Sequence, residues 1–259
     1  MRYFAEIRYN GFAYCGWQVQ QNAHTIQEAV NKALTTLLGS EIECIGCGRT
    51  DTGVHATQYY IHFDTNQTID SFRFIYQFNS IVGYDIAMLG LYPVDDGCHA
   101  RFDATSRCYH YVITHYKDPF LNHLALYQYD QLHLAPMNEA CQLLKEHTDF
   151  KSLSKTNTQA KTNLCSIQHA QWVNVGDFTY FRIESNRFLR GMVRALVGTM
   201  LIIGREKMTV AQFENILHGR DRKLAGENEE PYGLYLSGVN YPFINNKYIR
   251  LPWMLGNTN

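Results

Sequence analysis

Apolar and polar residues follow a regular pattern in the first hundred residues. Residues 3–9 (YFAEIRY) predict a strand, and residues 26–39 carry apolar side chains at helical spacing behind the N-cap residue Thr25. Strands at 41–47, 57–65 and 85–94 and a helix at 70–82 complete the pattern. The resulting order βαββαβ is typical of a ferredoxin-like half, an antiparallel sheet with helices on one face.

A comparable series of elements follows residue 104. Strands are expected at 106–115, 163–175, 178–185 and 232–241, and helices at 136–148, 187–203 and 209–218. We therefore expect an α+β fold of two halves, 1–103 and 104–259. The polar stretch 151–163 lacks periodicity and predicts a mobile surface loop.

Composition narrows the class of protein. Hydrophobic residues make up 46% of the 259 residues, as in globular proteins. There is no run of about 18 apolar residues and no signal-peptide pattern at the N-terminus, so we expect no membrane segment and a cytoplasmic location. The seven cysteines are scattered and odd in number, which favours reduced thiols over a disulfide framework.

Net charge gives no overall sign of a nucleic-acid partner. The chain has 23 basic and 24 acidic residues, a formal charge of -1. Basic residues nevertheless gather in the stretch 181–207, with Arg182, Arg187, Arg190, Arg194, Arg205 and Lys207 against Glu184 and Glu206. An RNA partner would have to bind through such local charge.

The triplet Asp51-Thr52-Gly53 raises the question of catalysis. An aspartic protease needs two such carboxylates, and this triplet occurs once and follows Arg49 and Thr50 rather than an apolar strand. Asp and Gly are also common in plain turns. A plain turn, however, needs neither Arg49 nor His55 beside the aspartate, which favours a functional turn.

Five motifs in order resemble the tRNA pseudouridine synthase A family. GRTDTGVHA (48–56) is similar to the family's G-R-T-D-A-G-V-H-A, with Thr52 in place of alanine. YNGFAYCGWQVQ (9–20), CHARFDATSRCYHYVI (98–113), FLRGMVRALVG (188–198) and PYGLYLSGVNYP (231–242) match further family motifs. The resemblance is strong over 1–113 and 178–242.

The resemblance implies an activity and a partner. Family members isomerise uridine to pseudouridine at positions 38 to 40 of the tRNA anticodon stem-loop, without a cofactor or metal, and form homodimers. It also implies that the two halves join their sheets into one mixed, mainly antiparallel sheet with an RNA-binding cleft. A non-catalytic tRNA-binding protein of the same fold is the alternative from another class.

By motif position, the resemblance makes Asp51 the catalytic carboxylate. It could attack C1′ or C6, or remove the 2′ proton, and each route requires the ionised form. Arg194 is implied as its cationic partner, and an arginine on a helix that is apolar nearly all round needs a buried or interfacial partner. Tyr109 is implied to stack on the target base and to help move the C5 proton. Tyr111, two residues on, is a second choice for the site or part of the core.

The resemblance also implies RNA contacts. A uridine must leave its stack to react, and Arg49 is implied to fill the vacated space and bind phosphate. Phosphate contacts are expected, beside plain surface roles, for Arg101, Arg107, Arg187 and Arg190. In the loop of the second motif we expect Gln18 and Gln20 to touch RNA, with Trp17 either there or in the core.

Two cysteine pairs could suggest a metal site. Cys44 and Cys47 have the spacing of a zinc half-site, but residues three apart in a strand point to opposite faces and no second such pair exists. Cys98 and His99 fall inside a family motif. The sequence therefore predicts structural cysteines and no metal.

Overall fold

The structure is a computed structural model that describes residues 1–155 and 161–244. It contains two compact units, one formed by Met1–Thr105 with the C-terminal stretch from Tyr235, the other by Ser106–Leu234. The division into domains at residues 103 and 104 stays a prediction. The units differ from it in placing the last strand with the first unit.

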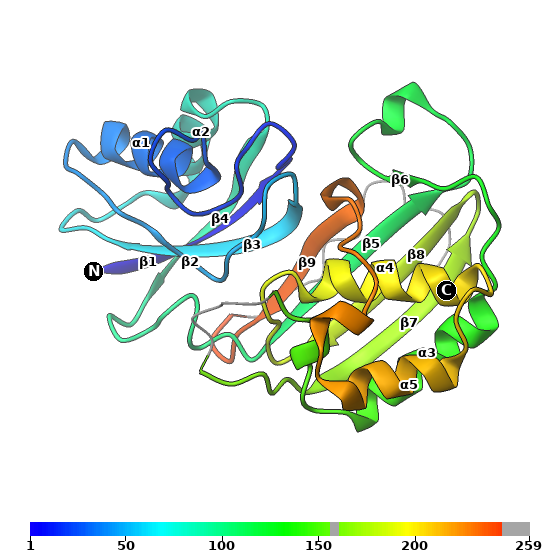
Figure 1. The fold of residues 1–259 in the computed structure, drawn as a ribbon. Coiled ribbons are helices and arrows are strands. Elements are labelled where there is room, and N and C mark those ends of the chain that lie inside the picture. Colours follow the sequence, from blue (N-terminus) through cyan, green and yellow to red (C-terminus); the bar gives the residue numbers. More distant parts are fainter. Residues whose placement is uncertain (156–160, 245–259) are drawn as a thin grey trace. The chain divides into compact units, whose positions relative to one another are not determined.

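The first unit is a mixed, mainly antiparallel sheet with two helices. Along the chain its elements are β1 (Arg2–Tyr9), α1 (Ile26–Leu38), β2 (Ile45–Gly46), β3 (His55–Asp64), α2 (Ser71–Ile81), β4 (Ile86–Val94) and β9 (Leu234–Asn240). β1 lies between β4 and β3 and is antiparallel to both, β2 is antiparallel to β3, and β9 runs parallel to β3. Helices α1 and α2 lie on the same side of these strands (Figure 1). This arrangement confirms the predicted βαββαβ order.

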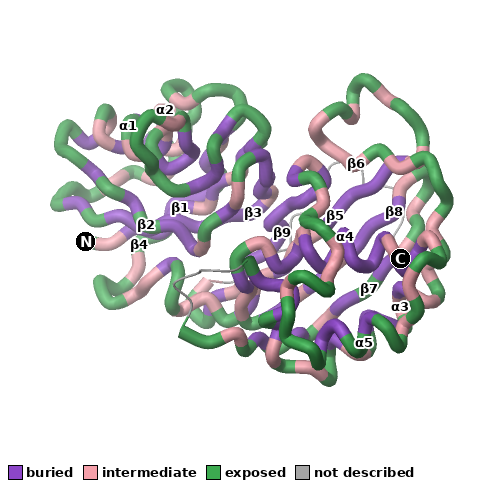
Figure 2. Tube along the Cα trace, viewed as in Figure 1, coloured by how far each residue is buried: buried purple, intermediate pink, exposed green. Residues whose placement is uncertain are grey.

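Local sequence explains why α1 forms where it does. The Thr25 hydroxyl accepts a hydrogen bond from the Glu28 N–H at 3.4 Å, and Gly39 ends the helix in the left-handed conformation at φ 66°. The apolar face of α1 is buried, including Val30 and Leu34 at 0% exposure. It packs into a core that also holds the strand residues shown as buried in Figure 2.

The second unit repeats the α+β design. Its elements are β5 (Ser106–Thr114), β6 (Leu126–Tyr127), α3 (Leu134–Glu146), β7 (Ile167–Val175), β8 (Phe178–Ser185), α4 (Met192–Gly204) and α5 (Val210–Gly219), with short 3-10 helices η1 (Pro119–Leu121), η2 (Lys151–Leu153), η3 (Arg222–Leu224) and η4 (Pro231–Gly233). β8 lies between β5 and β7 and is antiparallel to both, and β6 is parallel to β5. The α+β fold with mainly antiparallel strands is thus confirmed.

Helices of the second unit are fixed to its strands by specific contacts. Trp172 on β7 stacks on Phe181 of β8 at 4.6 Å, and its indole N–H donates to the Met200 sulfur of α4 at 3.0 Å. The Asn138 side chain of α3 exchanges two hydrogen bonds with the Trp172 main chain. None of the helices in the described part of the chain has the length and apolarity to cross a bilayer.

Several elements differ from the sequence-based expectations by a few residues at their ends, and three stretches differ in their structure. Helix α4 begins at Met192 rather than at residue 187, because Gly191 takes the left-handed conformation at φ 71° and separates the helix from the preceding residues. The strand expected at 41–47 is reduced to β2. Of the stretch 151–163, Ser152 and Leu153 are buried at 0% exposure, so its beginning is not a surface loop, and 156–160 lie outside the described residues.

Candidate active site

Asp51 lies in the turn that connects β2 and β3. The turn is closed by a hydrogen bond from the Val54 N–H to the Asp51 carbonyl at 3.2 Å. Gly53 adopts φ 77°, a conformation that disfavours side chains. Asp51 itself is half-buried, whereas its neighbour Thr52 is exposed. The aspartate is thus held on a fixed backbone with part of its surface accessible.

The loop of the second family motif packs directly behind this turn. A Cβ on Gly16 would lie 2.6 Å from the Thr50 carbonyl oxygen, and a Cβ on Gly11 would lie 2.0 Å from that of Val54. The Trp17 N–H donates to the Thr50 carbonyl at 3.1 Å. Backbone against backbone leaves no room for side chains, so these glycines set the position of the turn.

Side chains around the turn are structural. The His55 Nδ1 accepts from the Gly11 N–H at 3.1 Å, and its ring stacks on Tyr235 at 4.7 Å. Trp17 is 3% exposed, and its ring lies tilted against that of Tyr59 with the ring centres 4.3 Å apart, which places it in the core, one of the two roles considered for it. His55 therefore holds the turn in shape rather than adding reactive surface to it.

The predicted RNA-contacting residues of the first unit lie at its surface. Gln18, Gln20 and Arg49 are exposed. The Gln20 side-chain amide donates to the Cys15 carbonyl at 3.0 Å, which fixes its direction within the loop. Arg101 is also exposed, with its guanidinium 5.7 Å from the centre of the Phe102 ring.

Tyr109 and Tyr111 occupy the same face of β5 in different surroundings. Tyr109 is half-buried and meets the Phe188 ring edge-on at 5.2 Å. Tyr111 is fully buried, its hydroxyl donates to the Glu230 carbonyl at 2.7 Å, and burial raises its pKa well above the usual value. Tyr111 is thus a core residue, and Tyr109 is the better candidate for contact with a substrate.

Arg194 lies in the first turn of α4 and is half-buried. Its Nε donates to the Glu229 carbonyl at 2.6 Å, while the Glu229 N–H donates back to the Arg194 carbonyl at 3.1 Å. The rest of the helix is buried nearly all round. Within this unit the Arg194 side chain is thus held by a main-chain carbonyl, and its pairing with Asp51 stays a prediction.

The other arginines of the second unit for which phosphate contacts are predicted lie on or against the connection that leads to α4. The Arg107 guanidinium on β5 donates to the Asn186 carbonyl at 3.1 Å. Arg187 is half-buried and Arg190 exposed, and both lie on the connection from β8 to α4, not in the helix where they were expected. Through the Asn186 carbonyl, Arg107 is held against the connection that carries Arg187 and Phe188, the residue whose ring contacts Tyr109.

The cysteine pair Cys44 and Cys47 and the imidazole of His99 serve the fold. Cys44 and Cys47 are both buried, and burial raises the pKa of Cys44. The His99 Nδ1 accepts from the N–H groups of Arg101 and Phe102 at 3.1 and 3.3 Å and so shapes the following turn. In the described ranges no group of three or more His, Cys, Asp or Glu side chains could hold a metal ion.

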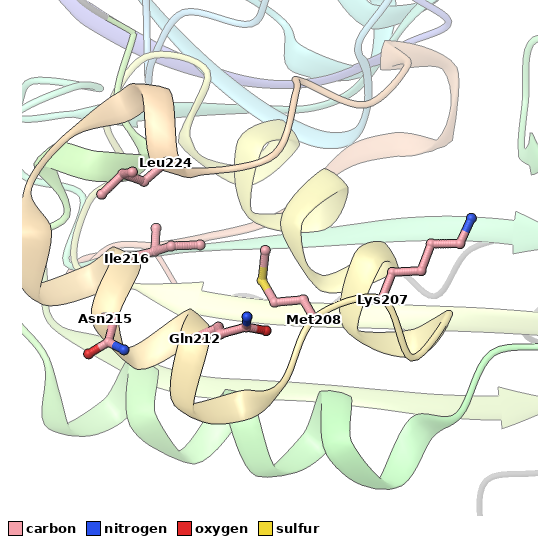
Figure 3. Close-up of a pocket in the computed structure, with 6 residues that line it drawn as sticks. All are labelled: Lys207, Met208, Gln212, Asn215, Ile216 and Leu224. Atoms are coloured by element: carbon pink, nitrogen blue, oxygen red, sulfur yellow. The ribbon is translucent and has the colours of Figure 1, made fainter.

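A surface hollow elsewhere in the second unit contains none of the predicted site residues. Figure 3 shows it beside α5, lined by Lys207, Met208, Gln212, Asn215, Ile216 and Leu224. Sequence reasoning did miss one feature of the candidate site, the main chain of residues 226–230 that holds Arg194. Gly198 and Gly226, whose missing side chains allow this contact, were the available signal.

Comparison with known proteins agrees with the motifs. A family model described as tRNA pseudouridine synthase matches residues 140–242. The chain is 44% identical over 243 residues to the tRNA pseudouridine synthase A of Parabacteroides distasonis, covering 93% of this chain and 96% of that protein. It is 43% identical to that of Bacteroides thetaiotaomicron (93% and 91% covered) and 35% identical to that of Francisella philomiragia (93% and 94%). With the motif residues placed as described, the chain belongs to the tRNA pseudouridine synthase A family, whose members are isomerases.

Proposed function

We propose that this protein isomerises uridine to pseudouridine at positions 38 to 40 of the tRNA anticodon stem-loop. In this reaction the N1–C1′ bond breaks, the sugar rejoins the base at C5, the C5 proton leaves and N1 gains a proton. The observation that carries the proposal is the Asp51 turn, held by Gly11, Gly16 and Gly53 with the aspartate itself half-buried. An aspartate fixed in this way suits attack on C1′ or C6, or removal of the 2′ proton.

Three further residues have proposed roles in the same step. Arg194 is the cationic partner of the Asp51 carboxylate. Tyr109 offers an aromatic face for stacking on the extruded base and a phenol for proton transfer at C5. Arg49 fills the space that the base leaves and binds phosphate. Its exposure in the turn beside Asp51 suits this role.

Phosphate contacts complete the proposed tRNA interaction. They are assigned to Arg101, Arg107, Arg187 and Arg190, with Gln18 and Gln20 contributing polar contacts. The family resemblance further supports a homodimer acting in the cytoplasm. Light scattering of the purified protein at twice the mass of the chain would support the dimer, and a single-chain mass would exclude it.

The decisive experiment is pseudouridine mapping by carbodiimide modification and primer extension. Unmodified tRNAs with uridine at 38, 39 or 40 alone are incubated with wild type, Asp51→Asn or Thr52→Ala. We expect stops with wild type and with Thr52→Ala, which carries the usual family residue on an exposed side chain, and none with Asp51→Asn.

Binding measured in parallel separates the two classes of function. Asp51→Asn should bind tRNA with nearly unchanged affinity, because the change removes charge but little volume. Retained binding with no stops in any protein would favour the non-catalytic tRNA-binding alternative. Parallel loss of binding and product in Asp51→Asn would contradict the catalytic assignment.

A further inference from the structure

Residues 225–230, here called the strap, run along the first half of α4. The Gly226 N–H donates to the Thr199 hydroxyl at 2.9 Å, and that hydroxyl donates to the Ala195 carbonyl within the helix at 2.7 Å. Further along, Glu229 and Arg194 exchange the two hydrogen bonds described above. The strap is therefore tied to the helix at both of its ends.

The strap and the helix are in direct backbone contact. A Cβ on Gly198 would lie 2.1 Å from the Glu227 carbonyl oxygen, and a Cβ on Gly226 would lie 2.9 Å from the Thr199 nitrogen. The strap backbone and the helix backbone therefore pack directly against each other. A displacement of one is transmitted to the other, because packed backbone cannot yield as a flexible side chain does. Any shift of the strap near Gly226 should thus move the Glu229 carbonyl and, with it, the Arg194 side chain.

Arg222 on η3 also holds the strap, through three hydrogen bonds. Its Nη1 donates to the carbonyls of Gly226 at 2.8 Å and Ala225 at 3.3 Å, and its Nη2 donates to the Asn228 side-chain oxygen at 2.9 Å. A planar guanidinium can make all three bonds at once, which fixes the curvature of the strap. The side chain is half-buried, so it is engaged mainly with the strap rather than with the core.

We propose that Arg222 is a positioning residue for the isomerisation: through the strap it fixes the guanidinium of Arg194. The inference rests on the proposed function, because it takes Arg194 as part of the catalytic machinery. In this proposal Arg222 acts indirectly, through its hydrogen bonds to the strap. Its contribution is to keep the Glu229 carbonyl where it accepts the Arg194 Nε–H, since small misplacement of a catalytic group costs much of the rate.

The test is a double-mutant cycle on the single-turnover rate. Arg222→Ala should lower the rate about tenfold or more while tRNA affinity changes less than about twofold. Arg194→Lys keeps the charge but lacks the Nε–H donor, so adding Arg222→Ala to it should cause no further loss. Lys223→Ala, an exposed neighbour on the same 3-10 helix, serves as the matched control and should behave as wild type.

Each contrary result identifies a different error. A wild-type rate in Arg222→Ala, or the same loss in both backgrounds, overturns the proposal, since Arg222 would then not act through Arg194. Loss confined to tRNA affinity would make Arg222 an RNA contact instead, which also overturns it. Absence of product with the wild-type protein would instead refute the proposed function.

Hydrogen exchange at Arg194 tests the proposal without an activity assay. It therefore separates failure of the proposal on Arg222 from failure of the proposed function. In protein labelled with ¹⁵N-arginine, the Arg194 Nε–H should exchange slowly with solvent because the Glu229 carbonyl accepts it. The exchange should speed up in Arg222→Ala and stay slow in Lys223→Ala. Unchanged exchange in Arg222→Ala, with the variant folded by circular dichroism, would reject the strap as the link.

Discussion

At the scale of single residues, Gly16 offers a direct test of how the Asp51 turn is held. Gly16→Ala adds a Cβ 2.6 Å from the Thr50 carbonyl oxygen at φ 83°, so it strains the loop and pushes the turn. We expect a loss of about 1–2 kcal/mol of folding stability from the left-handed conformation alone. The displaced carboxylate should lower turnover on the order of 10²-fold. Urea unfolding and single-turnover rates measure the two effects.

Gly39 provides the control for the Gly16 experiment. It also has a positive φ, 66°, but a Cβ there meets no atom within 4 Å. Gly39→Ala should therefore lose about 1–2 kcal/mol of stability and keep wild-type turnover. Equal loss of turnover in both variants would show that reduced stability, not a displaced turn, explains the Gly16 result.

His62 predicts a pH dependence of stability. Its side chain is 2% exposed, its Nδ1 accepts the Ala100 N–H at 3.1 Å, and burial, with Arg2 nearby, lowers its pKa from 6.5 to about 4. The unfolded chain thus binds a proton that the folded chain excludes, and stability is lost as pH falls from 6.5 towards 4. The expected slope is about 1.4 kcal/mol per pH unit for this one proton.

The matched variant is His62→Asn, whose side-chain oxygen can still accept the Ala100 N–H but does not titrate. Its unfolding free energy should fall less steeply than that of wild type over the same pH range, because one proton fewer is taken up on unfolding. The pKa of His110 is also lowered to about 4, mainly by burial. Unfolding therefore takes up a proton at His110 in both wild type and His62→Asn. Parallel curves for wild type and His62→Asn would contradict the assignment.

At the scale of elements, the spacing of apolar residues in the sequence predicted most of the helices and strands, because those residues form the buried faces of these elements. Helix α1 and strands β1 and β4 follow their apolar spacing closely, because burial of mainly one face determines each of them, whereas β3 is buried on both faces. Helix α4 shows the limit: its apolar run begins at Phe188, but Gly191 interrupts the helix in a conformation that spacing does not reveal. The motifs singled out Asp51 and Arg194, whereas the strap holds Arg194 through a main-chain carbonyl, and the glycines Gly198 and Gly226 are the sequence signal of its contact with the helix.

Helix α5 yields a prediction confined to its own element. The Thr209 hydroxyl accepts from the Gln212 N–H at 3.2 Å, and the Gln212 side chain accepts from the Thr209 N–H at 2.8 Å. Thr209→Ala should cost about 1 kcal/mol of stability, while Thr209→Ser keeps the hydroxyl and most of the stability. Pseudouridine formation should be unchanged in both. Equal urea midpoints for the two variants would show that the capping hydroxyl contributes nothing.

At the scale of the whole molecule, a formal charge of -1 contrasts with a proposed polyanionic substrate. Part of the basic stretch 181–207 is engaged internally. Arg182 pairs with Glu184 at 3.0 Å, the Arg205 guanidinium donates to the Gln128 side chain, and Arg194 donates to Glu229. Binding must therefore depend on a few phosphate contacts rather than on a general positive field.

Salt dependence of tRNA affinity tests this directly. If Arg190 contacts a phosphate, Arg190→Ala should weaken binding and reduce the slope of log affinity against log salt by about 1. Arg182→Ala should leave the slope unchanged, because its guanidinium is already paired with Glu184 on the same strand. Fluorescence anisotropy with labelled anticodon stem-loop over a salt series gives both slopes. A flat response in the wild-type protein would mean that few phosphates are neutralised, and the arginines assigned to phosphate contact would then have only surface roles.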